Sequence, residues 1–277
     1  MAIRRRSLIA IMPSSLIAIM PPTPSHRVIS DSNPIKAIVQ YARKHAPKRG
    51  NSGRGRPPKY REWKLAALCM LKTYLNTSFD KLTALAPYII GETPSKATIY
   101  RAWLRLAEWA EQALAELQGS AGLAVVDSTG LKGWRKNFKL HIAYSLEREK
   151  VLAVEATEPN FSDAKGLKIL LKKLKGPGIL VADSAYFGVN LFKASAEKDL
   201  LLLAKPRKPP RGYRRRGWAR RLEVLYEAGS RLYRRRGEGE RGCFRLKYAT
   251  RWRVFYVKVE SCRAHMLYLA LAMAVAG

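Results

Sequence analysis

Apolar side chains recur at helical spacing through the first part of the chain. Over residues 62–76, 78–86 and 93–118, apolar positions lie three and four residues apart with polar residues between them, as in amphipathic helices. Ser95 stands near the start of the third segment, where its hydroxyl can cap a helix. The pattern therefore predicts two short helices followed by one long, capped helix.

The second part of the chain changes to short apolar runs bounded by glycine and polar residues, which are typical of strands. The predicted strands are 122–130, 138–147, 151–158, 178–186 and 199–206, and the predicted helices are 162–174 and 187–198. Three strands in a row, followed by helix, strand, helix and strand, predict an α/β fold with a mixed sheet flanked by helices.

Charge indicates what kind of partner the protein binds. The 277 residues include 52 Lys and Arg against 21 Asp and Glu, a formal net charge of +31. So large an excess repels itself unless phosphates neutralise it, which favours nucleic acid. An anionic membrane surface is the alternative, but the closing apolar segment, 265–277, is too short to span a bilayer. We predict a core helix for that segment and no membrane partner.

Cysteine usage favours the cytoplasm. Cys69, Cys243 and Cys262 are far apart, and their spacing matches neither a disulfide framework nor a zinc site. Together with a nucleic-acid partner, this predicts a cytoplasmic, nucleoid-associated protein.

The amino-terminal segment differs from the rest of the chain. The sequence SLIAIMP occurs at 7–13 and again at 15–21, and prolines interrupt it, so duplicated coding sequence or a misplaced start explains it better than a secretion signal. Residues 1–35 are therefore predicted to be a poorly ordered leader. Residues 36–60 are rich in basic residues, with Gly and Pro toward their end, and predict a flexible linker.

The linker contains a short DNA-binding candidate. Its RGRP sequence resembles an AT-hook, in which Arg54 and Arg56 would enter the minor groove of A·T-rich DNA. A plain solvated linker is the alternative.

The helical region, residues 61–119, is a second DNA-binding candidate. Two short helices and a capped third follow the order of a helix-turn-helix, in which Lys96, Thr98 and Arg101 would face the major groove. A generic three-helix bundle is the alternative. The charge of the chain favours DNA binding.

Two aspartates occupy equivalent places in the second part of the chain. Asp127 and Asp183 each end a predicted buried strand, just before small residues. Either one alone would be read as a turn former. If the two strands are neighbours, both carboxylates emerge at one edge of the sheet, where a bound cation makes them tolerable together.

A third acidic residue lies in a dense block of arginines. At 100° per residue, Tyr233, Arg236, Glu240 and Lys247 fall on one stripe about 60° wide, while Glu238 points away. Three glycines oppose this helix, because each costs a helix interior roughly 1 kcal/mol. We predict one helix that presents Glu240 among basic side chains and is held by packing or bound DNA. The alternative is a helix that ends near Gly242, in which case Lys247 lies off it.

For four other polar and aromatic residues we expect mainly structural roles. Asp163 is expected to cap a helix, and His141 to lie on a sheet face where it touches DNA or a neighbouring residue. Trp134 and Trp252 could stack on an unpaired base, but core positions are the simpler expectation.

These residues resemble the insertion-sequence DDE transposases. Tyr233, Arg236, Glu240 and Lys247 match the spacing of that family's tyrosine-arginine-glutamate-lysine motif. The sequences VVDSTG and VADSAY are similar to its two aspartate blocks. The similarity covers residues 120–277, and the preceding helices resemble the family's DNA-binding region.

The resemblance implies an RNase H-like catalytic domain over residues 120–277. It implies two Mg²⁺ ions, with Mn²⁺ as a possible substitute. Asp127, Asp183 and Glu240 would be the catalytic, metal-holding residues. Tyr233, Arg236 and Lys247 would contact DNA near the scissile phosphate.

We therefore expect a transposase that binds terminal inverted repeats and target DNA, and that cleaves and joins strands as a homodimer on paired ends. Two alternatives remain at this point. A nuclease or resolvase of the same fold would cleave without strand transfer. An inactive transposase remnant would bind DNA only.

Overall fold

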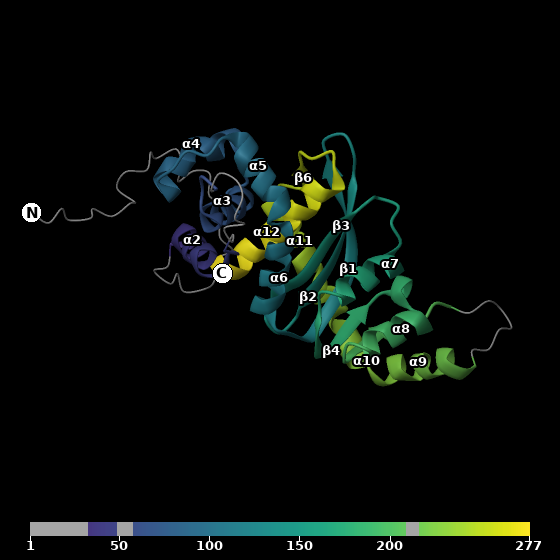
Figure 1. Ribbon diagram of the computed structural model, residues 1–277. Helices are drawn as coiled ribbons and strands as arrows, with labels where there is room; N and C mark the ends of the chain where they lie inside the picture. Colours follow the sequence, from purple (N-terminus) through teal and green to yellow (C-terminus); the bar gives the residue numbers. More distant parts are fainter. Residues whose placement is uncertain (1–32, 49–57, 209–215) are drawn as a thin grey trace, which may run out of the picture. The chain divides into compact units, whose positions relative to one another are not determined.

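A computed structural model of the chain describes residues 33–48, 58–208 and 216–277 (Figure 1). The repeated leader up to residue 32 and the AT-hook candidates Arg54 and Arg56 lie outside these residues. Asn33–Gly277 form one compact unit.

Helices fill the first part of this unit. They are α2 (Pro34–His45), α3 (Glu62–Tyr74), α4 (Phe79–Ile90), α5 (Lys96–Arg105) and α6 (Ala107–Gln118). The hydroxyl of Ser95 caps α5 by accepting a hydrogen bond of 3.2 Å from the Thr98 amide, as predicted.

The strands form a mixed, RNase H-like sheet, which confirms the predicted fold class (Figure 1). The strands are β1 (Ser120–Gly133), β2 (Phe138–Ser145), β3 (Lys150–Thr157), β4 (Lys175–Ala182) and β5 (Leu200–Ala204), and the short β6 (Arg253–Val254) pairs with the far end of β1. Their order is β3-β2-β1-β4-β5. β1, β2 and β3 are antiparallel, and β4 and β5 run parallel to β1.

Helices pack on both faces of the sheet. α7 (Asp163–Leu171) and α8 (Val189–Ala196) pack on one face, and α11 (Glu240–Ala249) and α12 (Val259–Ala276) pack on the other (Figure 1). Side chains of β1 alternate between the two layers. Val125 packs with the α11–α12 side, whereas Ala124 and Val126 pack with the α7–α8 side.

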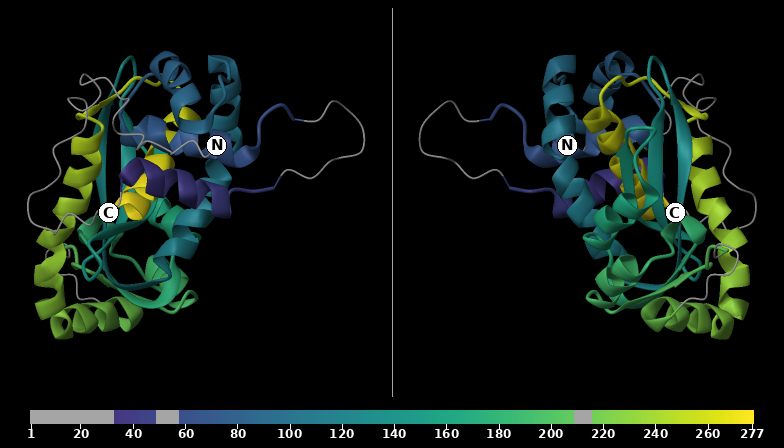
Figure 2. Two further views of the ribbon diagram at one scale, coloured as in Figure 1. Left: turned by 90° about the vertical axis from the view of Figure 1, so that its left-hand side faces the viewer. Right: turned by 90° about the vertical axis from the view of Figure 1, so that its right-hand side faces the viewer.

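A series of short helices leads into α11. α9 (Gly217–Ala228), α10 (Ser230–Arg234) and the 3-10 helix η3 (Arg235–Gly239) precede it, and the segment runs along one side of the sheet (Figure 2). A second 3-10 helix, η2 (Ser184–Tyr186), follows β4 directly.

The helical region and the sheet were predicted as separate units, but they share a core. The last helix, α12, packs against α2, α3, α6 and β3. The Tyr268 hydroxyl on α12 donates a hydrogen bond of 3.1 Å to the Trp103 carbonyl on α5. By length and composition α12 could cross a membrane, but 61% of it is buried inside the protein, as expected of a core helix.

Two further expectations need correction. Residues 36–45 of the predicted flexible linker are helical, because Ile38 and Ala42 lie four residues apart and are buried, while basic residues such as Lys44 stay exposed. The predicted helix 93–118 breaks at Leu106. The break lets α5 bury Trp103 while α6 takes a separate course against α12.

Candidate active site

The structure places Asp127 and Asp183 side by side. β1 and β4 are parallel neighbours, and their paired residues end with Val126 and Ala182. Each aspartate is the next residue along its chain. Both side chains are half-buried.

Only one of these aspartates ends a strand. Asp183 follows the last residue of β4, and its Oδ1 accepts a hydrogen bond of 2.8 Å from the Ala185 amide at the start of η2. Asp127 was also predicted at a strand end, but it lies within β1. The reason is that β1 continues to pair with β2 as far as Leu131 and Phe138.

Glu240 begins α11 and approaches the aspartates from the next element. The predicted single helix through Tyr233, Arg236, Glu240 and Lys247 is wrong, because η3 interrupts it between α10 and α11. A uniform 100° per residue therefore does not describe this segment. Nevertheless Arg236 Nη1 lies 3.9 Å from Asp127 Oδ2.

Several charged groups influence the pKa of Asp127. Burial raises the pKa of Asp127, while the Ser128 amide and the Arg236 guanidinium lower it. The negative charges of Asp183 and Glu240 raise it further. Three carboxylates and one guanidinium thus act on one half-buried point, which leaves an excess of negative charge.

Two glycines allow η3 and α11 to lie close to the sheet. A Cβ at Gly239 would overlap Val125 on β1, and a Cβ at Gly242 would overlap the ring of Tyr144 on β2. At Gly237, in contrast, a Cβ would meet no atom within 4 Å. The glycines that weaken the predicted helix therefore let Glu240 approach the carboxylates of the sheet.

The other residues of the predicted motif lie around this point. Burial raises the pKa of the Cys243 thiol to about 12, and the charges of Asp127, Lys247, Glu240 and Arg236 also act on it, in that order. The Lys247 ammonium lies 5.6 Å from the ring centroid of Trp252.

Tyr233 and Glu238, in the segment that leads into α11, make separate contacts. The half-buried ring of Tyr233 packs against Tyr226, with centroids 4.9 Å apart. Glu238 forms two hydrogen bonds with Arg235, of 2.9 and 3.0 Å. The expectation that Glu238 points away from the site agrees with these contacts.

The donor set suits a divalent cation. Carboxylate oxygens are the ligands that Mg²⁺ prefers, and the mutual repulsion at Asp127 would be relieved by a bound ion. As they stand, no three His, Cys, Asp or Glu side chains in the described part of the chain converge on one ion. Binding would therefore draw the three carboxylates closer together.

The candidate DNA-binding residues of the helical region do not belong to this cluster. Lys96 Nζ lies 2.8 Å from Asp80, and both side chains are exposed. Arg101 is exposed further along α5, and the Thr98 hydroxyl lies 2.9 Å from the Ser95 hydroxyl. The buried face of α5 carries Ile99 and Trp103.

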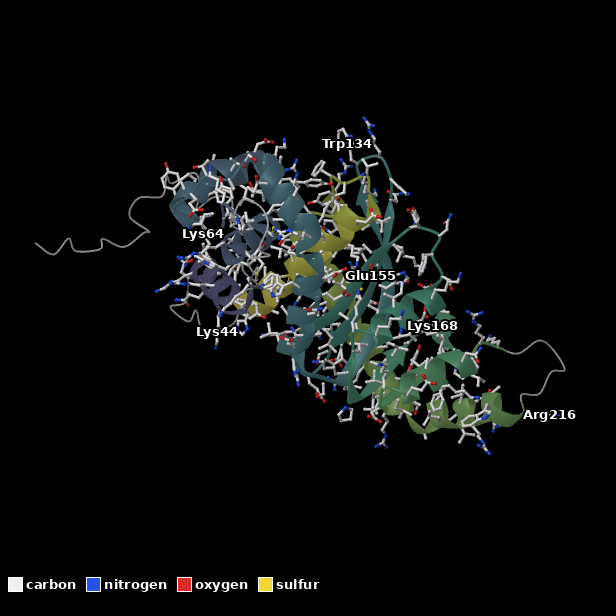
Figure 3. All side chains as sticks on the ribbon, in the orientation of Figure 1. Lys44, Lys64, Trp134, Glu155, Lys168 and Arg216 are labelled. Atoms are coloured by element: carbon white, nitrogen blue, oxygen red, sulfur yellow. The ribbon has the colours of Figure 1, made fainter. Side chains whose placement is uncertain are left out.

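Four other residues differ in part from their expected roles. Asp163 is the first residue of α7 and pairs with Lys139 instead of capping the helix. His141 is fully buried against Thr157, a neighbouring residue and not a DNA-facing position. Trp134 and Trp252 are exposed and not core residues, and Figure 3 shows Trp134 extending from the hairpin between β1 and β2.

Sequence reasoning missed the residues that support the turn after β4. Arg207 Nε donates a hydrogen bond of 2.9 Å to the Ser184 carbonyl. Tyr186 and Ser128 lie behind the aspartates. Both residues lie within the two aspartate blocks, VVDSTG and VADSAY, and this was the sequence indication of their importance.

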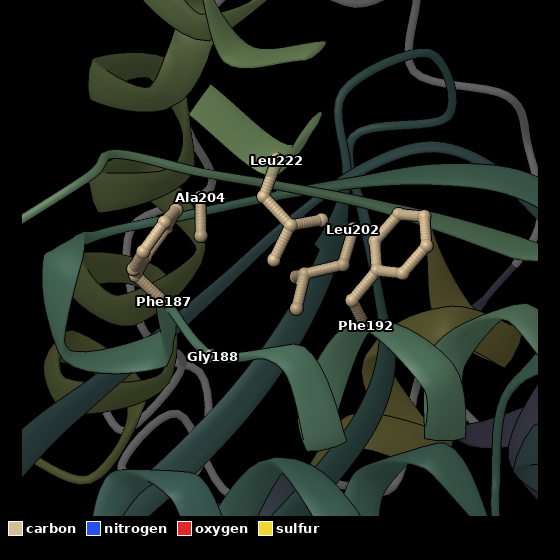
Figure 4. Close-up of a pocket in the computed structure, with 6 residues that line it drawn as sticks. All are labelled: Phe187, Gly188, Phe192, Leu202, Ala204 and Leu222. Carbon is tan, nitrogen blue, oxygen red and sulfur yellow. The ribbon is translucent and has the colours of Figure 1, made fainter. Parts of the chain in front are cut away.

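A small apolar hollow lies elsewhere, between α8, α9 and β5 (Figure 4). Its lining residues are Phe187, Gly188, Phe192, Leu202, Ala204 and Leu222. None of these side chains is ionisable, so the hollow offers no catalytic chemistry.

Comparison with known families agrees with the geometry. The family model described as "Transposase DDE domain" matches residues 119–275, more than half of the chain. The chain belongs to the DDE transposase family. The match includes β1, β4 and α11, which carry the three carboxylates, and α12, which joins the transposase domain to the preceding helices. A comparison with curated proteins found no match.

Proposed function

We propose that this transposase binds the ends of an insertion sequence, cleaves them and joins them to target DNA. The observation that carries the proposal is that Asp127 and Asp183 directly follow paired residues of β1 and β4, with Arg236 beside Asp127 and the charge of Glu240 acting on it. A cluster of acids on so basic a protein has an evident use in holding cations against DNA.

Asp127, Asp183 and Glu240 would hold the divalent ions, normally two Mg²⁺, with Mn²⁺ as a substitute. When bound, such ions activate an attacking oxygen and stabilise the leaving oxygen of a phosphoryl transfer. The attacking oxygen belongs to water in cleavage and to a 3′-hydroxyl in strand transfer.

The basic residues of the motif would hold the DNA. The guanidinium of Arg236 can bind a phosphate through two parallel hydrogen bonds, and Lys247 contributes a point charge. Tyr233 lies on the same segment and would contact the strand near the scissile phosphate. The acids and the basic residues thus have complementary roles.

The helical region would supply the recognition of the element ends. Lys96, Thr98 and Arg101 on α5 would face the major groove of the terminal repeat, and Arg54 and Arg56 would enter the minor groove. Joining two ends requires two active sites, so we infer a homodimer on paired ends. We also infer that it works in the cytoplasm, at the nucleoid.

Strand transfer distinguishes this function from that of a nuclease. Terminal-repeat DNA with a free 3′-hydroxyl should be joined covalently to a supercoiled plasmid in the presence of Mg²⁺. Products would be resolved on a denaturing gel. Cleavage of the ends without joined product would favour a nuclease or resolvase, and binding without cleavage would favour an inactive remnant.

A further inference from the structure

A polar cluster lies on the face of the sheet opposite the three carboxylates. Ser128 follows Asp127 on β1, and because side chains alternate along a strand it faces α7 instead of α11. Asp163, the first residue of α7, lies 2.8 Å from Lys139 Nζ on β2. Ser128 pairs across the sheet with His141 on β2, whose Nδ1 lies 3.8 Å from Asp163 Oδ1. The cluster therefore joins β1, β2 and α7 directly behind Asp127.

Tyr186 extends this cluster to the turn that carries Asp183. It ends η2, three residues after Asp183, and only 1% of its surface is exposed. η2 packs against α7, and Asp163 at the start of α7 is the charge that acts most strongly on the Tyr186 hydroxyl. Burial and the nearby carboxylates raise the pKa of Tyr186, so the hydroxyl keeps its proton and remains a donor.

Backbone pairing alone does not fix the distance between the two aspartates. The ladder between β1 and β4 stops at Val126 and Ala182, one residue before Asp127 and Asp183. Beyond that point β1 remains paired with β2, whereas the chain after β4 turns away into η2. Some other contact must hold η2 against β1 if the carboxylates are to keep a defined separation.

The hydroxyl of Tyr186 is the group placed to make that contact. It is buried, and among the described residues it has no hydrogen-bond partner. A buried, unpaired hydroxyl costs free energy that a phenylalanine at the same position would avoid. A small rotation of Ser128 or Asp163 would give it an acceptor.

We propose that Ser128, Asp163 and Tyr186 are positioning residues that hold the turn after β4 against β1 and so set the separation of Asp127 and Asp183 for a divalent ion. The inference rests on the proposed function, in which these aspartates hold that ion. In this role the three residues would contact neither the ion nor DNA. They act through the backbone that carries the two carboxylates.

The substitution Tyr186→Phe removes only the hydroxyl. The full-length protein, without DNA, would be titrated with Mn²⁺ while free Mn²⁺ is measured by electron paramagnetic resonance. We expect Mn²⁺ affinity to fall about tenfold, as is typical when a group that supports a metal ligand is removed. The Mg²⁺ concentration for half-maximal end cleavage should rise by a similar factor, with a smaller change at saturating Mg²⁺.

Tyr268→Phe is the matched control. It removes a buried tyrosine hydroxyl whose hydrogen bond to the Trp103 carbonyl lies in the helical region. It should lower the unfolding temperature and leave Mn²⁺ affinity unchanged. Ser128→Ala tests the same contact from β1 and serves if Tyr186→Phe does not fold. In the double variant, Ser128→Ala should add little to the loss of Mn²⁺ affinity caused by Tyr186→Phe, because both substitutions remove the same contact.

Several outcomes would overturn the inference. Wild-type Mn²⁺ affinity in both Tyr186→Phe and Ser128→Ala would exclude a positioning role, and so would an equal loss of affinity in Tyr268→Phe. If the wild-type protein shows no Mn²⁺ binding that depends on Asp127, the proposed metal site itself fails, and this inference with it.

Discussion

Asp127 and Lys72 are ionisable residues that the fold buries in whole or in part. At the site, Asp127 keeps its pKa raised because burial and two further carboxylates outweigh the Arg236 guanidinium. In the helical region, Lys72 is buried, and its ammonium lies 4.9 Å from the ring centroids of both Phe79 and Trp103. Lys72 also donates a hydrogen bond of 2.7 Å to the Tyr256 hydroxyl.

The environment of Lys72 gives a prediction for the pH dependence of stability. Burial lowers its pKa to about 8, although the nearby Cys69 partly opposes the shift. Between pH 8 and about 10 the folded state therefore binds fewer protons here than the unfolded state, so this residue makes the free energy of unfolding rise with pH. The rise should reach at most about 3 kcal/mol. Urea unfolding of wild type and Lys72→Met across this range should show the difference in slope, and equal slopes would contradict it.

Single elements were predicted well where their pattern is local. Short apolar runs located β1 to β5, with boundaries that differ by only a few residues. The segment from Tyr233 to Lys247 was predicted less well, because an angle of 100° per residue assumes one regular helix. Close packing of Gly239 and Gly242 against the sheet accompanies a 3-10 turn there, and such contacts with distant strands are invisible in a local pattern.

This packing predicts that alanine at Gly242 lowers stability and cleavage, whereas alanine at Gly237 does not. Gly242→Ala should push α11 away from Tyr144, lower the free energy of unfolding by roughly 1–3 kcal/mol and reduce cleavage. Gly237→Ala is the control, since its Cβ meets open space and alanine favours helical backbone. Thermal unfolding and a cleavage assay on both variants would test this. A Gly237→Ala variant as impaired as Gly242→Ala would refute the packing argument.

At the scale of the whole molecule, the sequence predicted the helical region and the sheet, but it did not predict that they share one core. The helical region and the sheet each have a clear pattern, yet their common core depends on α12, which ends the chain and returns to α2, α3 and α6. A pairing between residues as far apart as Trp103 and Tyr268 leaves no local trace. The neighbouring positions of Asp127 and Asp183 could be predicted only conditionally, because parallel pairing of β1 with β4 follows from the topology.

The molecule as a whole should act in pairs on DNA. With a net charge of +31, monomers repel one another, and phosphates of two element ends would offset that repulsion. Native mass spectrometry should therefore show a complex of two protomers with two end duplexes. Its formation should weaken steeply as salt rises from about 50 to 200 mM. Only monomers on single duplexes, under conditions that support cleavage, would contradict the prediction.

The central claim is that Asp127, Asp183 and Glu240 form one metal-dependent site. It is tested most directly by Mg²⁺-dependent nicking of end DNA, with a gel shift beside it, in Glu240→Gln and Glu238→Gln. Removal of a supporting group typically costs about 10- to 100-fold, so loss of a ligand should reduce nicking more than about a hundredfold. DNA binding should remain. Glu238→Gln should nick normally, because Glu238 is paired with Arg235 and is not one of the proposed metal ligands. Loss of nicking in Glu238→Gln with normal nicking in Glu240→Gln would contradict the account.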